Sequence, residues 1–227
     1  MNVFYKRFLF SIGIILCLMT DASADYRKIS QTGDSTSEKV TIAKIYYTGG
    51  INIQKTNELI GALDDLNMNY RNLGKIYLYI NSYGGDMDSG YIAYQAIKSS
   101  RIPVVTVNLA TVMSAATMLF CGASERSSFE GAQFIMHPAA ISQSSRMQPD
   151  QLEMAQQTLG RYNQMLVDIY KGCSDFREGE LKSILYSEDQ RKVLSSDEAR
   201  KRGVVTELTS RIADAQVSYF VSDGNSK

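Results

Sequence analysis

The fold of this chain is decided by residues 76–85, which have the sequence IYLYINSYGG. The first five of these residues are aliphatic or aromatic, which is typical of a strand that is buried on both faces. The glycine pair Gly84-Gly85 breaks that pattern, and apolar residues at helical spacing follow over residues 92–97. The stretch therefore predicts a strand, a glycine turn and a helix.

Two further segments extend this arrangement. Residues 104–107, VVTV, predict a strand, and residues 114–120, SAATMLF, predict a short helix, so Ser114 lies at a strand-to-helix turn. Residues 134–137, FIMH, form another apolar run, and it ends in the only histidine of the sequence. Open α/β sheets place their sites in a crevice at the carboxyl ends of parallel strands, so we expect the glycine turn and the Ser114 turn to face each other.

The length and composition predict one α/β domain. The 227 residues are 44% hydrophobic, which is enough for one sizeable core. A strand at residues 40–47 and a helix from Thr56 precede the strand at residue 76, so the chain opens as a β-α-β unit. Repetition of this unit predicts an α/β class with a mostly parallel sheet, over residues 40–222.

The charge balance argues against nucleic acid as a partner. Lys and Arg together number 24, as do Asp and Glu, and no basic stripe interleaved with aromatic residues is found in the sequence. A neutral substrate or a protein partner fits this composition better.

The first 24 residues match a secretory signal peptide. Lys6 and Arg7 precede an apolar run at residues 8–19, and Ala-Ser-Ala at residues 22–24 provides a cleavage site. The alternative is a membrane anchor, but the run is shorter than the about 20 residues that a spanning helix needs. We therefore expect a periplasmic or secreted protein with no stable membrane span after cleavage, and a flexible arm at residues 25–39.

Two further features leave alternatives open. In an oxidising compartment Cys121 and Cys173 could form a disulfide, although a buried free Cys121 is the more ordinary interpretation. A helix from Pro149 to Gly172 has an apolar stripe in steps of three and four residues. This helix either lies on the core of its own domain or projects and packs against a partner subunit. The stripe consists of Leu152, Ala155, Leu159, Tyr162, Leu166 and Ile169.

The turns could supply the groups that amide hydrolysis requires, namely a nucleophile, a base and donors for the oxyanion. Ser114 at a helix start would be the nucleophile, and His137 the base. The amide of Ala115 and the glycine pair would be the donors. Each group also has an ordinary structural interpretation, as a helix cap, a structural histidine or a simple turn. The pattern alone leaves the function open.

Four parts of the sequence closely resemble the proteolytic subunit of Clp protease, the ClpP family. They are residues 77–85, Gly90, the Ser114 turn and residues 135–137. A weaker similarity extends over about residues 40–208. The resemblance implies the fold of the ClpP/crotonase superfamily, with repeated β-β-α units and a projecting handle helix at about residues 140–185. It also implies a serine peptidase that needs no cofactor, acts on peptides or unfolded proteins, and assembles as a homo-oligomer.

The resemblance assigns roles to individual residues. It makes Ser114 the nucleophile and His137 its base, with Gly85 and Ala115 as the oxyanion hole. Arg191 stands where the family has its catalytic aspartate. The third member of the centre is therefore open: Asp189 is the carboxylate we favour among the neighbours, Glu188 is an alternative, and a serine-histidine dyad without a carboxylate is another.

Other departures concern the surroundings and the partners. Tyr83 replaces a proline of the family, and Met113-Ser114-Ala115 replaces its Ala-Ser-Met. Export would separate this chain from the cytoplasmic ATPases that serve the family, which argues against an ATPase partner, and the sequence has no phosphate-binding loop of its own. Two other functions compete: a crotonase-type acyl-CoA enzyme, and a catalytically silent subunit that contributes only to assembly.

Overall fold

The computed structural model describes residues 27–30, 37–142 and 146–223. The expected signal peptide, residues 1–24, lies outside these residues. Within the described ranges, no helix combines the length and the apolar character that a membrane crossing requires.

The strands of the described residues form one nine-stranded sheet. Its order is β1-β9-β2-β3-β4-β5-β8, with β6 beside the later part of β4 and β7 beside β6. All neighbours are parallel except the pairs β1·β9 and β6·β7. The strands are β1 (Arg27–Ser30), β2 (Ile42–Thr48), β3 (Lys75–Ser82), β4 (Val104–Met113), β5 (Glu125–Phe129), β6 (Gln133–Met136), β7 (Lys192–Ser195), β8 (Glu207–Thr209) and β9 (Val217–Val221).

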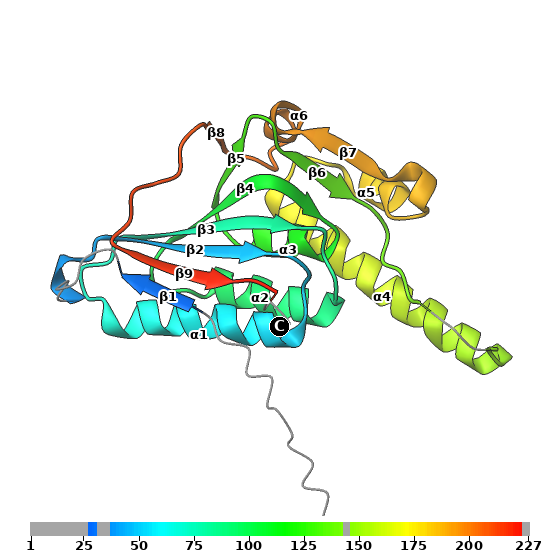
Figure 1. The fold of residues 1–227 in the computed structure, drawn as a ribbon. Coiled ribbons are helices and arrows are strands. Elements are labelled where there is room, and N and C mark those ends of the chain that lie inside the picture. The colour runs from blue at the N-terminus through cyan, green and yellow to red at the C-terminus, as the bar shows by residue number, and fades with distance from the viewer. Residues whose placement is uncertain (1–26, 31–36, 143–145, 224–227) are drawn as a thin grey trace, which may run out of the picture.

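Helices cover one face of the central strands, and one long helix projects from the body (Figure 1). The helices are α1 (Ile53–Asn69), α2 (Met87–Lys98), α3 (Ala115–Cys121), α4 (Pro149–Cys173), α5 (Glu178–Ile184) and α6 (Ser196–Lys201), with short 3₁₀ turns η1 (Ser37–Lys39) and η2 (Glu188–Gln190). The mixed α/β architecture with a mostly parallel sheet confirms the fold class that the sequence predicts.

The strand that the sequence places at the centre of the fold is central in the structure. In β3, Ile76, Leu78 and Ile80 are fully buried towards the main core. Tyr79, on the opposite face, is 1% exposed and packs with Val105 and Val107 of β4. Burial of both faces explains why β3 is a nearly continuous apolar run.

The arm predicted at residues 25–39 needs correction for the part that the structure describes. Residues 27–30 form β1, which pairs antiparallel with β9, and residues 37–39 form η1. The physical reason is the edge of the sheet, because the backbone groups of β9 that face away from β2 find partners in β1.

Helix α4 divides the predicted apolar stripe between two environments. Its C-terminal half packs on the core, where Leu166 is 1% and Ile169 5% exposed. Its N-terminal half extends away from the body (Figure 1), and Leu152 and Met154 there are 55% and 65% exposed. The structure therefore shows core packing for the C-terminal half and projection for the N-terminal half (Figure 1), and packing against a partner subunit stays a prediction. The projecting half presents apolar side chains that nothing in this chain covers among the described residues.

Candidate active site

Ser114 lies in a strained turn between β4 and α3. Its φ of 56° and ψ of −130° make it the only non-glycine residue with positive φ among the described residues. Such a conformation costs about 1 to 3 kcal/mol and persists only where the surroundings enforce it. The Ser114 hydroxyl makes no capping hydrogen bond to α3, so the simple cap interpretation does not apply. A half-buried hydroxyl is thus presented on a sharp strand-to-helix turn, as in nucleophile elbows.

The glycine turn after β3 packs directly against this elbow. Gly84 and Gly85 have φ values of 92° and 151°, in the region that favours glycine. A Cβ on Gly84 would lie 2.7 Å from the Ser114 Cβ and 2.8 Å from the Met113 carbonyl oxygen. Only glycine allows this approach, so the structure brings the two turns together, as the sequence predicts.

Two backbone amides near the elbow have no acceptor within the described residues. Ile51 pairs with the glycine turn by donating to the Gly84 carbonyl and accepting from the Asp86 amide, which leaves the Gly85 N–H unused. Ala115 is the first residue of α3, where an N–H has no partner inside the helix. The Gly85 and Ala115 amides are therefore available to bind a developing oxyanion.

His137 follows β6 beside the elbow. Strands β4 and β6 run parallel with Met113 opposite Ile135, and the Ser114 amide donates to the Ile135 carbonyl at 3.1 Å. Ser114 and His137 therefore both follow the carboxyl ends of two neighbouring parallel strands, at the same edge of the sheet. The His137 side chain is 14% exposed, and its Nε2 is buried without a hydrogen-bond partner in the described part of the chain.

The other ring nitrogen of His137 is held by Glu188. Nδ1 lies 3.1 Å from Glu188 Oε2. Since a carboxylate only accepts hydrogen bonds, this contact assigns the proton of a neutral ring to Nδ1 and leaves the lone pair on Nε2. That is the tautomer a general base requires. The Ser114 hydroxyl does not donate to Nε2 in this structure and would have to come within reach when substrate binds.

Glu188 also forms an ion pair with Arg191. Arg191 Nη1 donates to Glu188 Oε1 at 2.9 Å, so the two carboxylate oxygens bind Arg191 and His137 separately. The bond from Arg191, and to a smaller extent the neighbouring His137, lowers the pKa of Glu188 below its ordinary value. Glu188 therefore stays charged as the medium becomes mildly acidic.

The structure places Glu188 at the ring, and not Asp189, which the sequence favoured. Asp189 is exposed and makes no hydrogen bond to the imidazole. The reason is the direction of η2, in which Glu188 is the residue that turns towards the ring while Asp189 faces solvent. Arg191 binds Glu188 and not the ring.

Arg191 gives a prediction for the pH dependence. Because the pKa of Glu188 is lowered, its carboxylate is fully charged at every pH above the ordinary pKa of a glutamate. The charge is lost only as the pH falls through the lowered pKa. Arg191→Gln removes the main cause, so the pKa of Glu188 rises and the orienting charge is lost at higher pH. We expect the acid limb of kcat/KM to move to higher pH. Lys192→Gln, which removes a nearby cation that does not bind Glu188, is the control, and superimposable profiles for the two variants would contradict the role of Arg191.

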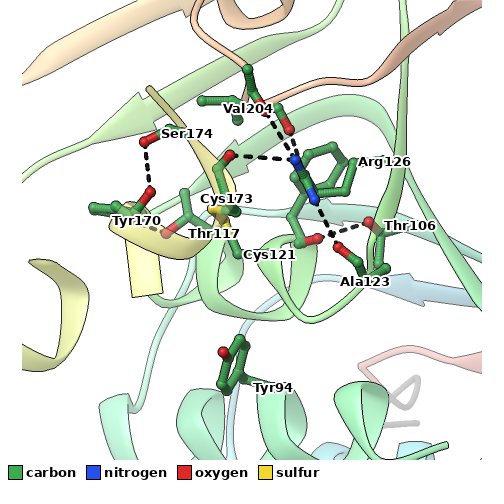
Figure 2. Close-up of a disulfide and its surroundings, with 12 residues drawn as sticks. Tyr94, Thr106, Thr117, Cys121, Ala123, Arg126, Tyr170, Cys173, Ser174 and Val204 are labelled. Carbon is green, nitrogen blue, oxygen red and sulfur yellow. Dashed lines mark hydrogen bonds between the residues drawn. A yellow bond between two sulfur atoms is a disulfide. The ribbon is translucent and has the colours of Figure 1, made fainter. Parts of the chain in front are cut away.

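The structure also pairs Cys121 with Cys173, which the sequence left open. Their Cα atoms are 5.5 Å apart, and the bond joins the last residue of α3 to the last residue of α4 (Figure 2). No group of three or more His, Cys, Asp or Glu side chains that could hold a metal ion is found in the ranges that the structure describes.

Sequence reasoning missed two residues behind the elbow. Arg126 is 8% exposed and donates to backbone carbonyls of Ala123, Ser124, Cys173, Gly203 and Val204 (Figure 2). Burial lowers the pKa of this guanidinium. Tyr170, which lies in the apolar stretch of α4, places its hydroxyl 2.6 Å from the Thr117 hydroxyl. The contacts of Arg126 with Cys173, Gly203 and Val204, and that of Tyr170 with Thr117, have no local signal because the partners are far apart in the sequence.

Comparisons with known proteins find similarity to Clp proteases. The sequence model of the Clp protease family matches residues 28–211. The chain is 28% identical over 142 residues to the ATP-dependent Clp protease proteolytic subunit 3 of Synechococcus sp. (strain CC9605), which covers 62% of this chain and 69% of that protein. It is 28% identical over 156 residues to the ATP-dependent Clp protease proteolytic subunit of Chlorella vulgaris, and this alignment covers 67% of this chain and 74% of that protein.

A solved structure shares the fold. A mutant of ClpP1 from Listeria monocytogenes aligns with a TM-score of 0.63 at 19% identity, covering 74% of this chain and 91% of that one. At this identity the likeness concerns the fold alone.

Proposed function

The chain belongs to the Clp protease family, and we propose that it is a serine peptidase that cleaves peptide bonds through Ser114 and His137. The observation that carries this proposal is the strained Ser114 elbow, whose hydroxyl caps no helix and whose turn lies beside the end of β6, the strand that immediately precedes His137. Strain of this kind has no use in a simple helix start, whereas it is common at active sites.

Acylation follows from the positions of these groups. The Ser114 oxygen attacks the carbonyl carbon of the peptide, and Nε2 of His137 takes the hydroxyl proton. Glu188 then faces an imidazolium, which its charge stabilises through Nδ1. The amides of Gly85 and Ala115 bind the oxyanion. When the intermediate collapses, Nε2 returns the proton to the departing amine.

Deacylation repeats these steps with water. The neutral His137 activates a water molecule that attacks the acyl carbon, and the same amides stabilise the second oxyanion. The released serine takes the proton back. No step needs a cofactor.

The substrate we infer is a peptide or an unfolded protein. The relatives are named as proteolytic subunits of ATP-dependent proteases. In our proposal this chain cleaves short peptides without ATP, because residues of the chain itself carry every chemical step. We also propose that residues 1–24 direct export of the chain and that it acts in an oxidising compartment. The Cys121–Cys173 disulfide supports that location.

Purified mature protein, incubated with a mixture of short unstructured peptides and no nucleotide, tests this proposal. We expect cleavage that a serine-directed inhibitor abolishes. Intact peptides after prolonged incubation would favour a silent assembly subunit. Thioester hydrolysis that survives Ser114→Ala would favour the acyl-CoA alternative.

The proposal also includes assembly through the projecting half of α4. Leu152→Asp combined with Met154→Asp should break a large oligomer into smaller species without lowering the melting temperature, since both side chains are more than half exposed in the single chain. Size-exclusion chromatography with light scattering measures this. Leu166→Asp is the contrasting variant, and it should unfold the subunit because Leu166 is 1% exposed. A wild-type monomer would contradict assembly through this helix.

A further inference from the structure

The helix that begins at the Ser114 elbow is attached to α4 at two successive turns (Figure 2). The first contact joins the hydroxyl of Thr117 to that of Tyr170, at 2.6 Å. The second is the disulfide between Cys121 and Cys173. Cys121 follows Thr117 by four residues and Cys173 follows Tyr170 by three, so each helix presents its two contacts on one face.

The first contact reaches the backbone of the nucleophile. The Thr117 hydroxyl donates to the Ser114 carbonyl oxygen, which also accepts from the Thr117 amide at 2.9 Å. A hydroxyl has one proton to donate, so Thr117 accepts from Tyr170. Tyr170 is 2% exposed, and burial raises the pKa of its hydroxyl well above the ordinary value, which keeps it a donor. A chain of hydrogen bonds therefore runs from α4 through Thr117 to Ser114.

Ser114 needs this kind of support. Its φ of 56° is unfavourable for a residue with a side chain, and the surrounding contacts must hold it. On the strand side the Ile135 carbonyl accepts from the Ser114 amide. On the helix side the support comes from Thr117, whose own position is fixed by Tyr170 and, one turn further, by the disulfide.

We propose that Tyr170 and the Cys121–Cys173 disulfide form a two-point clamp that positions the Ser114 elbow, so that acylation of Ser114 is fast only while the disulfide is intact. This inference rests on the proposed function and adds its regulation. Tyr170 and Thr117 are positioning residues, since they act through the Ser114 backbone and touch no reacting atom.

A dithiol reductant would open the clamp. Cys121 is partly exposed and lines a pocket of about 520 Å³, whereas Cys173 is 3% exposed. A thiolate of the reductant attacks the Cys121 sulfur and displaces the Cys173 thiolate, which takes up a proton. The second thiol of the reductant then forms its own disulfide and releases Cys121 as a thiol. Two electrons and two protons pass to the protein, and the reductant becomes a cyclic disulfide.

Reduction should loosen this corner without unfolding it. Arg126 donates to the Cys173 carbonyl at 3.5 Å and to the Ala123 carbonyl at 2.9 Å, so it joins the ends of α4 and α3 whatever the state of the sulfurs. We therefore expect reduction to lower the rate at which Ser114 reacts and to leave the fold of the subunit intact.

Variants of the hydroxyl chain test the first point of the clamp. Thr117→Val and Tyr170→Phe should lower kcat about threefold to tenfold with KM unchanged, which corresponds to the worth of one hydrogen bond. Thr117→Ser keeps the hydroxyl and should retain most of the rate. Tyr94→Phe removes a tyrosine hydroxyl from α2 that bonds only to Lys98 and is the matched control. Equal rates for Thr117→Val and Thr117→Ser would overturn the role of the hydrogen bonds that run from Tyr170 through Thr117 to Ser114.

The second point is tested by the rate constant for phosphonylation of Ser114 by a fluorophosphonate, in which the serine oxygen displaces fluoride from phosphorus as it would attack a peptide carbonyl, before and after treatment with dithiothreitol. We expect a severalfold decrease that reoxidation reverses, and no response in the Cys121→Ser, Cys173→Ser double variant, which should already be slow. Equal rates in the oxidised and reduced wild type would overturn the proposal.

A separate readout distinguishes failure of the clamp from failure of the proposed function. If the oxidised protein does not react at Ser114, the peptidase proposal fails, and hydrogen exchange of the amides of residues 115–121 then decides on the clamp. Faster exchange after reduction would support it, and unchanged exchange would reject it.

Discussion

Ser114→Ala should lower peptide hydrolysis by about four to six orders of magnitude, which is the scale seen when a serine nucleophile is removed from the protease template. The substitution removes one hydroxyl and keeps the Cβ, so the elbow retains its backbone conformation. Since that hydroxyl caps no helix, the melting temperature should stay within experimental error of wild type. Peptide turnover and thermal unfolding measure the two effects.

Ser99→Ala is the matched control for this variant. Ser99 is exposed at the C-terminal end of α2, where its hydroxyl donates to the Gln95 carbonyl. It should hydrolyse peptides at the wild-type rate. Activity in Ser114→Ala that equals Ser99→Ala would show that another group is the nucleophile.

The second large effect is expected for Glu188→Gln, with a loss of about a hundredfold or more in kcat. In the protease template, replacing the orienting aspartate costs about 10⁴, because the histidine adopts the wrong tautomer. An amide at Glu188 can present its NH₂ group to Nδ1, which would move the ring proton to Nε2 and remove the base. The loss should be smaller than in the template because the Glu188 side chain is 54% exposed.

Asp189→Asn is the control that separates this account from the assignment favoured by the sequence. Asp189 is the next residue of the same turn, carries the same charge and makes no bond to the ring. It should be almost silent. A large loss in Asp189→Asn with a small one in Glu188→Gln would reverse the assignment, and silence in both would indicate a serine-histidine dyad.

Much of the framework could be predicted from the sequence because it depends on local patterns. The apolar run of β3, the glycine pair and the small residues after Ser114 specify a strand, a turn and a helix within short windows. The strand at residues 104–107 was predicted too short, since β4 continues to Met113. Its second part contains Asn108, whose side-chain NH₂ group donates to the Gln133 carbonyl, and Thr111, whose backbone amide donates to Asn81 Oδ1. No local pattern reveals such partners.

The details of the site depend on contacts between distant residues, so the sequence could not specify them. The choice between Glu188 and Asp189 is made by η2, in which a rotation of one residue changes which carboxylate faces His137. The pairing of Cys121 with Cys173 requires the ends of two helices 52 residues apart to meet. The contact between Thr117 and Tyr170 requires the same packing.

The most direct test of the central claim is the reaction of the purified protein with an active-site-directed fluorophosphonate, followed by peptide mapping of the modified residue. We predict one adduct per chain, located on Ser114, and a much slower reaction in His137→Ala, where no second histidine can act as the base. Ser114→Ala should give no adduct. A folded wild-type protein that remains unmodified, or an adduct on another serine, would contradict the account.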